Sequence, residues 1–316
     1  MRSEGLPENS VAFVPTEDQV LAYFDQLSNW GRWGADDELG TLNLISPANV
    51  RSAAAEVRAG ISVGCARRII TEGPLTDVTI PPLHFMLNSG ESHDNTRAND
   101  YFGIFPHGLT ITHVDALAHQ FWQGHIYNNR PRTTVTTSAG ARFCSVDAMR
   151  NGIITRGVLL DMPSLTGRRY LDAGEPILPE HLDQAEKQQQ VELRPGDALL
   201  IRTGWSLRRS ELGPHPTPRE RPGLHAATLP WLYRREVAVV ASDASHDVFP
   251  SGYDRVEVPV HSIGIVAMGL CLIDACQFED LIAACSSMGR WSFLFVVAPV
   301  RFAHGTASPV TPIAVF

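Results

Sequence analysis

The sequence lacks the long apolar run that a membrane-spanning helix requires. Its longest apolar stretch runs roughly from Ser262 to Ile273, whereas a bilayer span needs about 20 such residues. The opening residues, MRSEGLPENSVAFVP, place Glu4, Pro7 and Glu8 where a secretory signal peptide needs an unbroken apolar core. We therefore predict a cytoplasmic protein without a membrane helix.

An excess of basic residues is also missing. The chain has 26 Lys and Arg residues against 34 Asp and Glu residues, which gives a formal net charge of -8. This balance argues against the basic surface that nucleic acids and anionic lipids require. We expect a small-molecule substrate as the partner, and neither a nucleic acid nor a membrane.

Patterns that would indicate thiol or serine chemistry are absent too. The five cysteines are odd in number and form no C-x-x-C pair, which indicates neither a thiolate zinc cluster nor a disulfide framework. We predict that they are reduced core residues. The nucleophile elbow G-x-S-x-G of α/β-hydrolases is not present either.

What the sequence does contain predicts one large α/β domain over residues 1–316. Hydrophobic residues make up 44% of the chain and charged residues 19%, enough for a sizeable core. Thr16 with Gln19, and Ser46 before Pro47, are helix-start patterns that predict a helical segment within residues 1–60. Short apolar runs then alternate with helical patterns, which is typical of α/β folds. The predicted strands are RGVLLDM, GDALLIRTGW, EVAVVASD and WSFLFVVAPV, and the predicted helices are LPEHLDQAEKQQQ, LHAATLPWLYRRE and QFEDLIAAC.

Two irregular stretches interrupt this pattern. Residues 76–101 predict an extended arm that is mostly loop and serves as a lid or a partner contact. Because the arm includes the apolar run IPPLHFML, we expect the chain to form a homo-oligomer, a dimer or tetramer. Residues 210–222 are polar and rich in proline, which predicts a surface excursion.

The strongest chemical signal is the stretch THVDALAHQFWQGHIYN, which begins at Thr112. If LTITHVDA is a strand, His107, His113 and Asp115 share one of its faces because side chains alternate with period two. Imidazole and carboxylate groups that converge in this way can bind Zn²⁺ or Mn²⁺. His119, four residues further on, is placed to act as a third ligand or as a general base.

This motif resembles the signature of the cyclase and metal-dependent hydrolase family that includes kynurenine formamidases and isatin hydrolases. The resemblance rests on T-H-x-D-A-x-x-H followed by G-x-x-Y-N, and it extends from about Trp30 to Val315 in the manner of a longer branch of the family. The further matching stretches are WGADDELGTLNLISP, GVLLDM, PGDALLIRTGW, PWLYRREVAVVASD, VPVHSIGIVAMGL and GTASPVTPIAV.

The resemblance implies a single α/β domain with a barrel-like mixed sheet flanked by helices, usually homo-oligomeric, with one or two divalent ions at the motif H-x-G-T-H-x-D-x-P-x-H. The first His of that motif falls on Leu109 in this chain, whereas His113, Asp115 and His119 are retained. His107 would replace the missing His only if the strand slides or bulges. We therefore expect one Zn or Mn ion per chain, and a site without metal stays open as an alternative.

Further candidates lie downstream. The family pattern carries a His at His261 and an acidic residue near Asp274, which imply a completing ligand and a supporting group, although Asp274 is shorter than the usual Glu. Asp243 and His246 follow a predicted strand, where site residues commonly collect. The candidate pocket or supporting residues are His107, Trp33, Phe121, Trp122, Asp243, His246 and Asp274, of which the three aromatic residues are candidate walls for an aromatic ring.

These residues lead to a functional hypothesis. An ion bound by His113, Asp115 and His261 would activate water, and His119 would act as general base in the hydrolysis of a formamide, lactam, lactone or similar amide or ester. Two alternatives stay open. One is a cyclase or dehydratase that acts on a polyketide-like intermediate with or without metal, which the loss of the motif His at Leu109 favours. The other is a non-catalytic ligand-binding scaffold.

Overall fold

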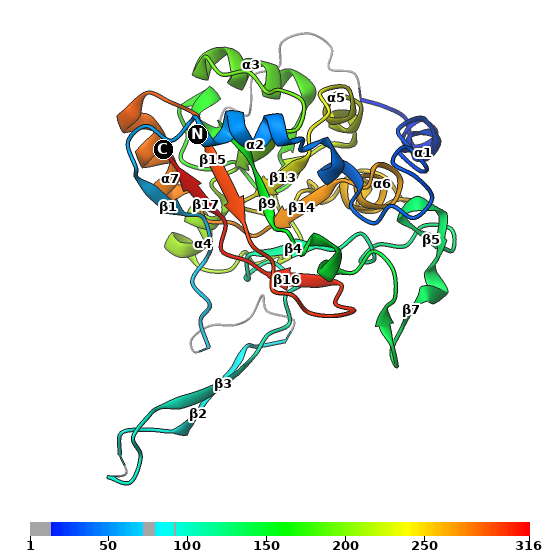
Figure 1. The fold of residues 1–316 in the computed structure, drawn as a ribbon. Coiled ribbons are helices and arrows are strands. Elements are labelled where there is room, and N and C mark those ends of the chain that lie inside the picture. Colours follow the sequence, from blue (N-terminus) through cyan, green and yellow to red (C-terminus); the bar gives the residue numbers. More distant parts are fainter. Residues whose placement is uncertain (1–13, 72–79, 92) are drawn as a thin grey trace.

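Nine strands form one mixed sheet that curls into a half-barrel in the computed structural model, which describes residues 14–71, 80–91 and 93–316 (Figure 1). The four strands β9, β11, β13 and β14 run parallel to one another, and every other pairing in this sheet is antiparallel. In spatial order the strands are β1 (Ser62–Gly64), β17 (Ile313–Val315), β15 (Ser292–Val297), β9 (Ile153–Asp161), β11 (Ala198–Arg202), β13 (Val239–Ser242), β14 (Cys271–Asp274), β4 (His113–Asp115) and β16 (Ala307–Pro309). The predicted α/β class and mixed sheet are confirmed.

Both faces of the central strands are buried, which explains why their sequences are apolar without interruption. Leu199 and Ile201 of β11 belong to one apolar cluster, and Ala198 and Leu200 belong to the other. Helices α1, α3, α5 and α6 contribute side chains to the first cluster, and α7 contributes to the second. The α-helices are α1 (Glu17–Gln26), α2 (Pro47–Ala54), α3 (Pro179–Gln189), α4 (Trp205–Leu212), α5 (Leu229–Arg234), α6 (Pro259–Ile263) and α7 (Glu279–Met288).

The helix starts predicted near the N-terminus are confirmed. The Thr16 and Ser46 side chains accept hydrogen bonds from the backbone N–H groups of Gln19 and Asn49, both at 3.3 Å. These bonds satisfy donors that a helix leaves free in its first turn. The shorter helical turns are η1 (Gly40–Leu44), η2 (Tyr127–Asn129), η3 (Arg132–Thr134), η4 (Val146–Met149), η5 (Met162–Thr166), η6 (Ala226–Thr228) and the π-helix η7 (Gly264–Met268).

A β-hairpin replaces much of the arm that the sequence predicted as loop. Strands β2 (Leu83–Asn88) and β3 (Asn99–Gly103) pair antiparallel and extend away from the main body (Figure 1). Phe85 and Tyr101 lie opposite each other across the two strands, and the contact between their rings, whose centroids are 5.0 Å apart, favours the pairing. The prediction of a mostly irregular arm is therefore wrong for this part, and residues 76–79 and 92 lie outside the described residues.

Three further strand pairs lie outside the main sheet. They are β5 (His125–Ile126) with β6 (Arg130–Pro131), β7 (Val135–Thr136) with β8 (Gly140–Ala141), and β10 (Pro176–Ile177) with β12 (Gly223–Leu224). All five cysteines are buried and free, as predicted. Within the part of the chain that the structure describes, no helix is both long and apolar enough to cross a membrane.

Candidate active site

Strand β4 carries the two central residues of the site. His113 and Asp115 are both 2% exposed, and His113 Nε2 lies 3.6 Å from Asp115 Oδ1. The strand is held between β14 and β16, and the Thr112 hydroxyl donates to the carbonyl of Ala275 at 2.7 Å. Two residues apart on one short strand, the imidazole and the carboxylate face the same side, as the sequence predicts.

The predicted strand is shorter than expected, because residues 107–111 bend away before β4 begins. Gly108 has φ +140, a conformation that side-chain-bearing residues rarely adopt. The bend brings His107 Nδ1 to 3.1 Å from Asp115 Oδ1 and stacks its ring on that of His119, with centroids 3.8 Å apart. His107 thus reaches the carboxylate through a bend and not through regular alternation along a strand.

A second carboxylate enters from the end of β14. Asp274 Oδ2 lies 3.1 Å from Nε2 of His261 on α6 and 3.9 Å from Nε2 of His113. Its short side chain therefore reaches the centre of the cluster.

Asp247 fixes the orientation of His261. Nδ1 of His261 donates to Asp247 Oδ2 at 2.5 Å, and the backbone N–H groups of Val260 and His261 donate to the same carboxylate at 2.7 and 3.1 Å. The side chain that orients the imidazole therefore also caps the start of α6. With Nδ1 occupied, Nε2 is left to face Asp274.

His246 and Asp243 follow β13 but have different surroundings. His246 is 1% exposed, and its Nε2 lies 3.3 Å from Asp274 Oδ1, close to that carboxylate but without a hydrogen bond to it. Asp243 instead accepts hydrogen bonds from the N–H and hydroxyl groups of Thr203 at 2.7 Å and from the N–H of Gly204 at 2.8 Å. Asp243 holds the turn before α4 and does not line the cavity at the cluster.

Charge interactions in the cluster outweigh the effect of burial on its carboxylates. Burial raises the pKa of Asp115, but the imidazoles of His119, His107 and His113 lower it to about 2. The pKa of Asp274 is likewise lowered, since burial is opposed by neighbouring imidazoles. Both carboxylates are therefore ionised near neutral pH and can act as ligands.

The imidazoles of His119 and His261 differ in their preferred protonation state. Burial lowers the pKa of His119 to about 4, although the charge of Asp115 acts in the opposite direction. Burial also lowers the pKa of His261, but Asp274 and Asp247 raise it well above the ordinary value. His119 is therefore neutral near pH 7 and able to accept a proton. The two carboxylates beside His261 favour its charged form, and a divalent ion at Nε2 would take the place of that proton.

The donor set fits a divalent ion. Two groups of ligand atoms, His107–Asp115–His119 and His113–Asp115–Asp274, each lie within 4.8 Å of one another and share Asp115. Oδ1 of Asp115 and Oδ1 of Asp274 are buried and accept no hydrogen bond from a described residue, although imidazole nitrogens of His107 and His246 lie 3.1 and 3.3 Å from them. Buried carboxylate oxygens are normally paired or bound to metal. Mixed imidazole and carboxylate ligands suit Zn²⁺ and Mn²⁺.

A cavity of about 180 Å³ opens beside the cluster. Its wall contains His107, His113, Asp115, His119, His261 and Asp274, together with Leu109, Gln120, Arg221, Ser245 and Val258. The cavity therefore joins the candidate metal ligands, the candidate base and a few polar groups in one space. Such a combination is typical of binding sites for small molecules.

The three aromatic residues that the sequence suggested as walls are not part of this cavity. Trp122 stacks on Phe24 with ring centroids 4.1 Å apart, Arg32 lies over the ring of Trp33, and Phe121 is 43% exposed. Phe121 and Trp122 are close to the motif in sequence, but the chain leaves the cavity wall after Gln120.

The second half of the motif has a structural role. The Asn128 amide donates to the carbonyls of Gly34, Ala35 and Asp37 at 3.0 to 3.1 Å, and the Tyr127 hydroxyl donates to the Asp37 carboxylate at 2.9 Å. These bonds fasten the glycine-rich loop before η1. The sequence pattern G-x-x-Y-N therefore supports the fold beside the site.

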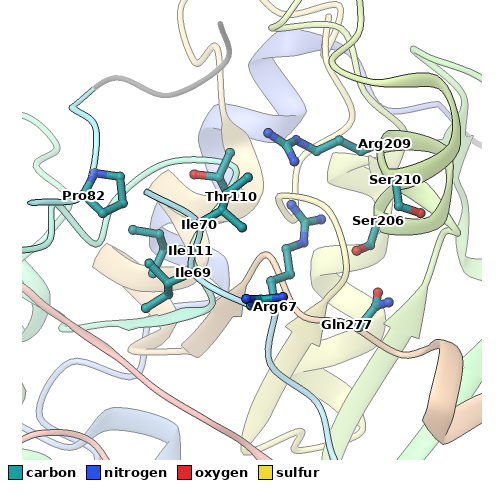
Figure 2. Close-up of a pocket in the computed structure, with 11 residues that line it drawn as sticks. Arg67, Ile69, Ile70, Pro82, Thr110, Ile111, Ser206, Arg209, Ser210 and Gln277 are labelled. Carbon is teal, nitrogen blue, oxygen red and sulfur yellow. The ribbon is translucent and has the colours of Figure 1, made fainter. Parts of the chain in front are cut away.

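An arginine that the sequence did not single out holds the site together from outside. The Arg67 guanidinium donates to the carbonyls of Leu109, Asp243 and Cys276, which joins the bend before β4 to the segments that follow β13 and β14. Arg67 also lines a separate cavity of about 200 Å³ together with Arg209, and Figure 2 shows the side chains around it.

Sequence reasoning also missed Asp247 and Arg221. Asp247 directly follows His246 in a polar run after a buried strand, which is a signal that could have identified it. Arg221 lies at the end of the segment predicted as a surface excursion, yet it is 8% exposed and lines the cavity. For this residue the prediction of a surface position is wrong.

Comparisons with known proteins agree with this geometry. A family model described as "Putative cyclase" matches residues 29–246. A crystal structure described as a novel cyclase is 29% identical, with a TM-score of 0.82, and the match covers 92% of this chain and 100% of that one.

More distant structures share the fold alone. Isatin hydrolase A from Ralstonia solanacearum is 18% identical with a TM-score of 0.60, and the match covers 85% of this chain and 97% of that one. A predicted metal-dependent hydrolase from Bacillus stearothermophilus is 15% identical with a TM-score of 0.50, and the match covers 80% and 97%. No curated protein matches the chain.

Proposed function

Because this chain belongs to the cyclase family, we propose that it is a metal-dependent hydrolase of small amides or esters of the formamide, lactam or lactone type. The observation that carries the proposal is the position of Asp115. Its carboxylate is shared by two groups of metal-capable side chains. Its buried Oδ1 lies 3.1 Å from His107 Nδ1 and 3.6 Å from His113 Nε2 but accepts no hydrogen bond from a described residue. An ion would satisfy that oxygen.

We assign one Zn or Mn ion per chain to His113, Asp115 and His261, with Asp274 as a further carboxylate. Asp247 keeps Nδ1 of His261 occupied, as the outer partners of metal-binding histidines commonly do. When bound, the ion would polarise the substrate carbonyl and lower the pKa of a water molecule towards about 7. His107, brought to Asp115 by the bend at Gly108, supports the Asp115 carboxylate, and no ligand is assigned at Leu109, where the family motif has its first His.

His119 acts as general base in this proposal. Its side chain lines the cavity, and its pKa, lowered to about 4 mainly by burial, leaves the ring neutral near pH 7. It accepts a proton from the attacking water and returns it to the leaving nitrogen or oxygen. Stacking on His107 holds its ring in place.

The experiment is hydrolysis of a panel of formamides, lactams and lactones by wild type and by His113→Ala, before and after removal of divalent ions. The proposal predicts turnover that chelation abolishes and that His113→Ala lacks. His125→Ala is a matched control, because His125 belongs to the same motif but is not part of the cavity wall. Turnover that survives both chelation and His113→Ala would contradict the metal-dependent mechanism.

A second candidate, cyclisation or dehydration of a polyketide-like intermediate, is favoured by Leu109. This residue gives the cavity an apolar wall at the place of the missing motif His. Mass spectrometry of the products separates the two functions, because hydrolysis adds one water and dehydration removes one. Loss of water from such a substrate, without hydrolysis of any panel member, would favour this candidate.

We also infer that the chain forms a homo-oligomer, a dimer or tetramer. The β2–β3 hairpin exposes several large apolar side chains to solvent, among them Leu83, Leu87 and Phe102, which are 58%, 62% and 67% exposed. A second copy that covers them would remove an apolar patch from water.

A further inference from the structure

Arg221 presents a buried cation to the candidate active site. The residue is 8% exposed and lines the same cavity as Asp274 and Ser245. Nothing in the metal-binding or proton-transfer roles proposed above uses it. Its position therefore calls for a separate explanation.

The guanidinium group lacks a full set of partners. Its Nη1 donates to the carbonyl of Arg219 at 2.8 Å, whereas its Nε is buried without a hydrogen-bond partner. Among ion pairs between residues that the structure describes, none includes Arg221. Because burying a charge without a close counter-charge is costly, an anion is the expected occupant of the space in front of it.

Two acidic groups of the site act on the charge of Arg221. Burial lowers its pKa, and the acidic groups that act most strongly against this effect are Asp247 and Asp274. The strongest charge effect on His119 comes instead from Asp115. The backbone of Arg221 pairs with Phe249, two residues after Asp247, so Arg221 enters the cavity wall from the segment that carries Asp247, and it is placed to bind a part of the substrate other than the group that receives the proton.

The backbone at Arg221 is fixed. Its N–H donates to the carbonyl of Phe249 at 3.1 Å, and the N–H of Phe249 donates back at 3.0 Å. The guanidinium carbon lies 5.3 Å from the centroid of the Phe249 ring. The segment that carries Asp247 thus also holds Arg221, so that the cation is positioned before a ligand arrives.

We propose that Arg221 binds a carboxylate of the substrate, so that the preferred substrates are amides or esters that carry a second, acidic group. A planar guanidinium matches a carboxylate with two parallel N–H donors, and such pairs are among the stronger hydrogen bonds in proteins. The substrate carboxylate would supply the counter-charge that the described residues do not place within ion-pair distance of Arg221. The identity of the cleaved bond rests on the proposed function, whereas the binding of a carboxylate by Arg221 does not.

Binding is tested with phenylacetate and its uncharged analogue phenylacetamide, by calorimetry on the protein as purified. We expect wild type to prefer phenylacetate and Arg221→Gln to bind it about 10- to 100-fold more weakly, as for the loss of hydrogen bonds to a charged group. Binding of phenylacetamide should stay unchanged. Arg219→Gln is the matched control, because Arg219 lies on the same loop with its side chain 62% exposed and paired with Glu257.

Two results would overturn the proposal. One is equal affinity of wild type for phenylacetate and phenylacetamide, a measurement that needs no variant. The other is unchanged phenylacetate binding by Arg221→Gln whose thermal unfolding matches wild type. Arg221→Lys keeps the charge but loses the two-donor geometry. We expect it to weaken phenylacetate binding by a smaller factor than Arg221→Gln.

Kinetics separates this inference from the proposed function. With 4-carboxyphenyl acetate and 4-carbamoylphenyl acetate as substrates, Arg221→Gln should raise KM for the acid alone. An equal loss of kcat for both esters would instead make Arg221 a group that acts on the reacting carbonyl, and would overturn the proposal. If neither ester nor any panel member is cleaved while phenylacetate binding still depends on Arg221, the proposed function fails and the anion site stands.

Discussion

Replacing Asp247 with Asn tests how the site holds its ion. In the structure the Asp247 carboxylate accepts the Nδ1 proton of His261 at 2.5 Å, which directs Nε2 towards Asp274. A carboxylate in this position fixes the tautomer of the imidazole and makes it a better ligand. Asn keeps one side-chain oxygen for the same hydrogen bond but removes the charge.

The expected loss follows from this geometry. Removing an outer partner of a metal-binding histidine typically costs 10- to 100-fold in metal affinity, which corresponds to about 1.4 to 2.7 kcal/mol. The backbone N–H groups of Val260 and His261 also donate to Asp247. Because an Asn oxygen can still accept one of these bonds, the free energy of unfolding should fall by only about 1 kcal/mol.

The assay is a titration of metal-depleted protein with Zn²⁺ and Mn²⁺ in competition with a chelator of known affinity. Asp254→Asn is the matched control, since Asp254 is an exposed acidic residue of the same region and is not part of the cavity wall. Thermal unfolding reports whether each variant is folded. A folded Asp247→Asn protein with wild-type metal affinity would refute the assignment of His261 as an oriented ligand.

Three further predictions concern the base, the assembly and the core. His119→Ala should retain the ion but lose about 10²- to 10⁴-fold in turnover, whereas His113→Ala should lose both the ion and turnover. Metal analysis and steady-state kinetics measure these effects. Release of metal by His119→Ala and not by His113→Ala would reverse the two roles. Sedimentation should give a multiple of the 34.6 kDa chain mass, with a shift towards monomer for Phe102→Asp; a wild-type monomer at micromolar concentration would contradict the homo-oligomer. Leu200→Ala, at a fully buried position of β11, should lower the free energy of unfolding by about 2 to 5 kcal/mol in denaturant titrations. A loss under about 1 kcal/mol would contradict this, because it would mean that neighbouring side chains fill the cavity left by the truncation.

The sequence predicted those parts of the fold that depend on local patterns. Thr16 and Ser46 cap helices through side-chain bonds to residues three positions away, so a few letters contain the whole signal. The buried strands β9, β11, β13 and β15 are likewise visible as apolar runs. The two central site residues, His113 and Asp115, followed from their spacing on a strand.

Contacts between distant segments could not be read in the same way. The bend that brings His107 to Asp115 depends on Gly108 and on the Arg67 side chain that holds the Leu109 carbonyl. Arg221 belongs to a proline-rich stretch with no regular period, and its burial results from pairing with Phe249. Such positions are set by tertiary packing, which local patterns do not contain.

Metal content tests the central claim most directly. The protein should be purified without chelators and without added metal, and its divalent ions measured per chain by elemental analysis, with His113→Ala beside wild type. The arrangement of His113, Asp115, His261 and Asp274 predicts about one Zn or Mn per wild-type chain and a large loss in the variant. A folded wild-type protein that binds no divalent ion even after metal is supplied would contradict the account.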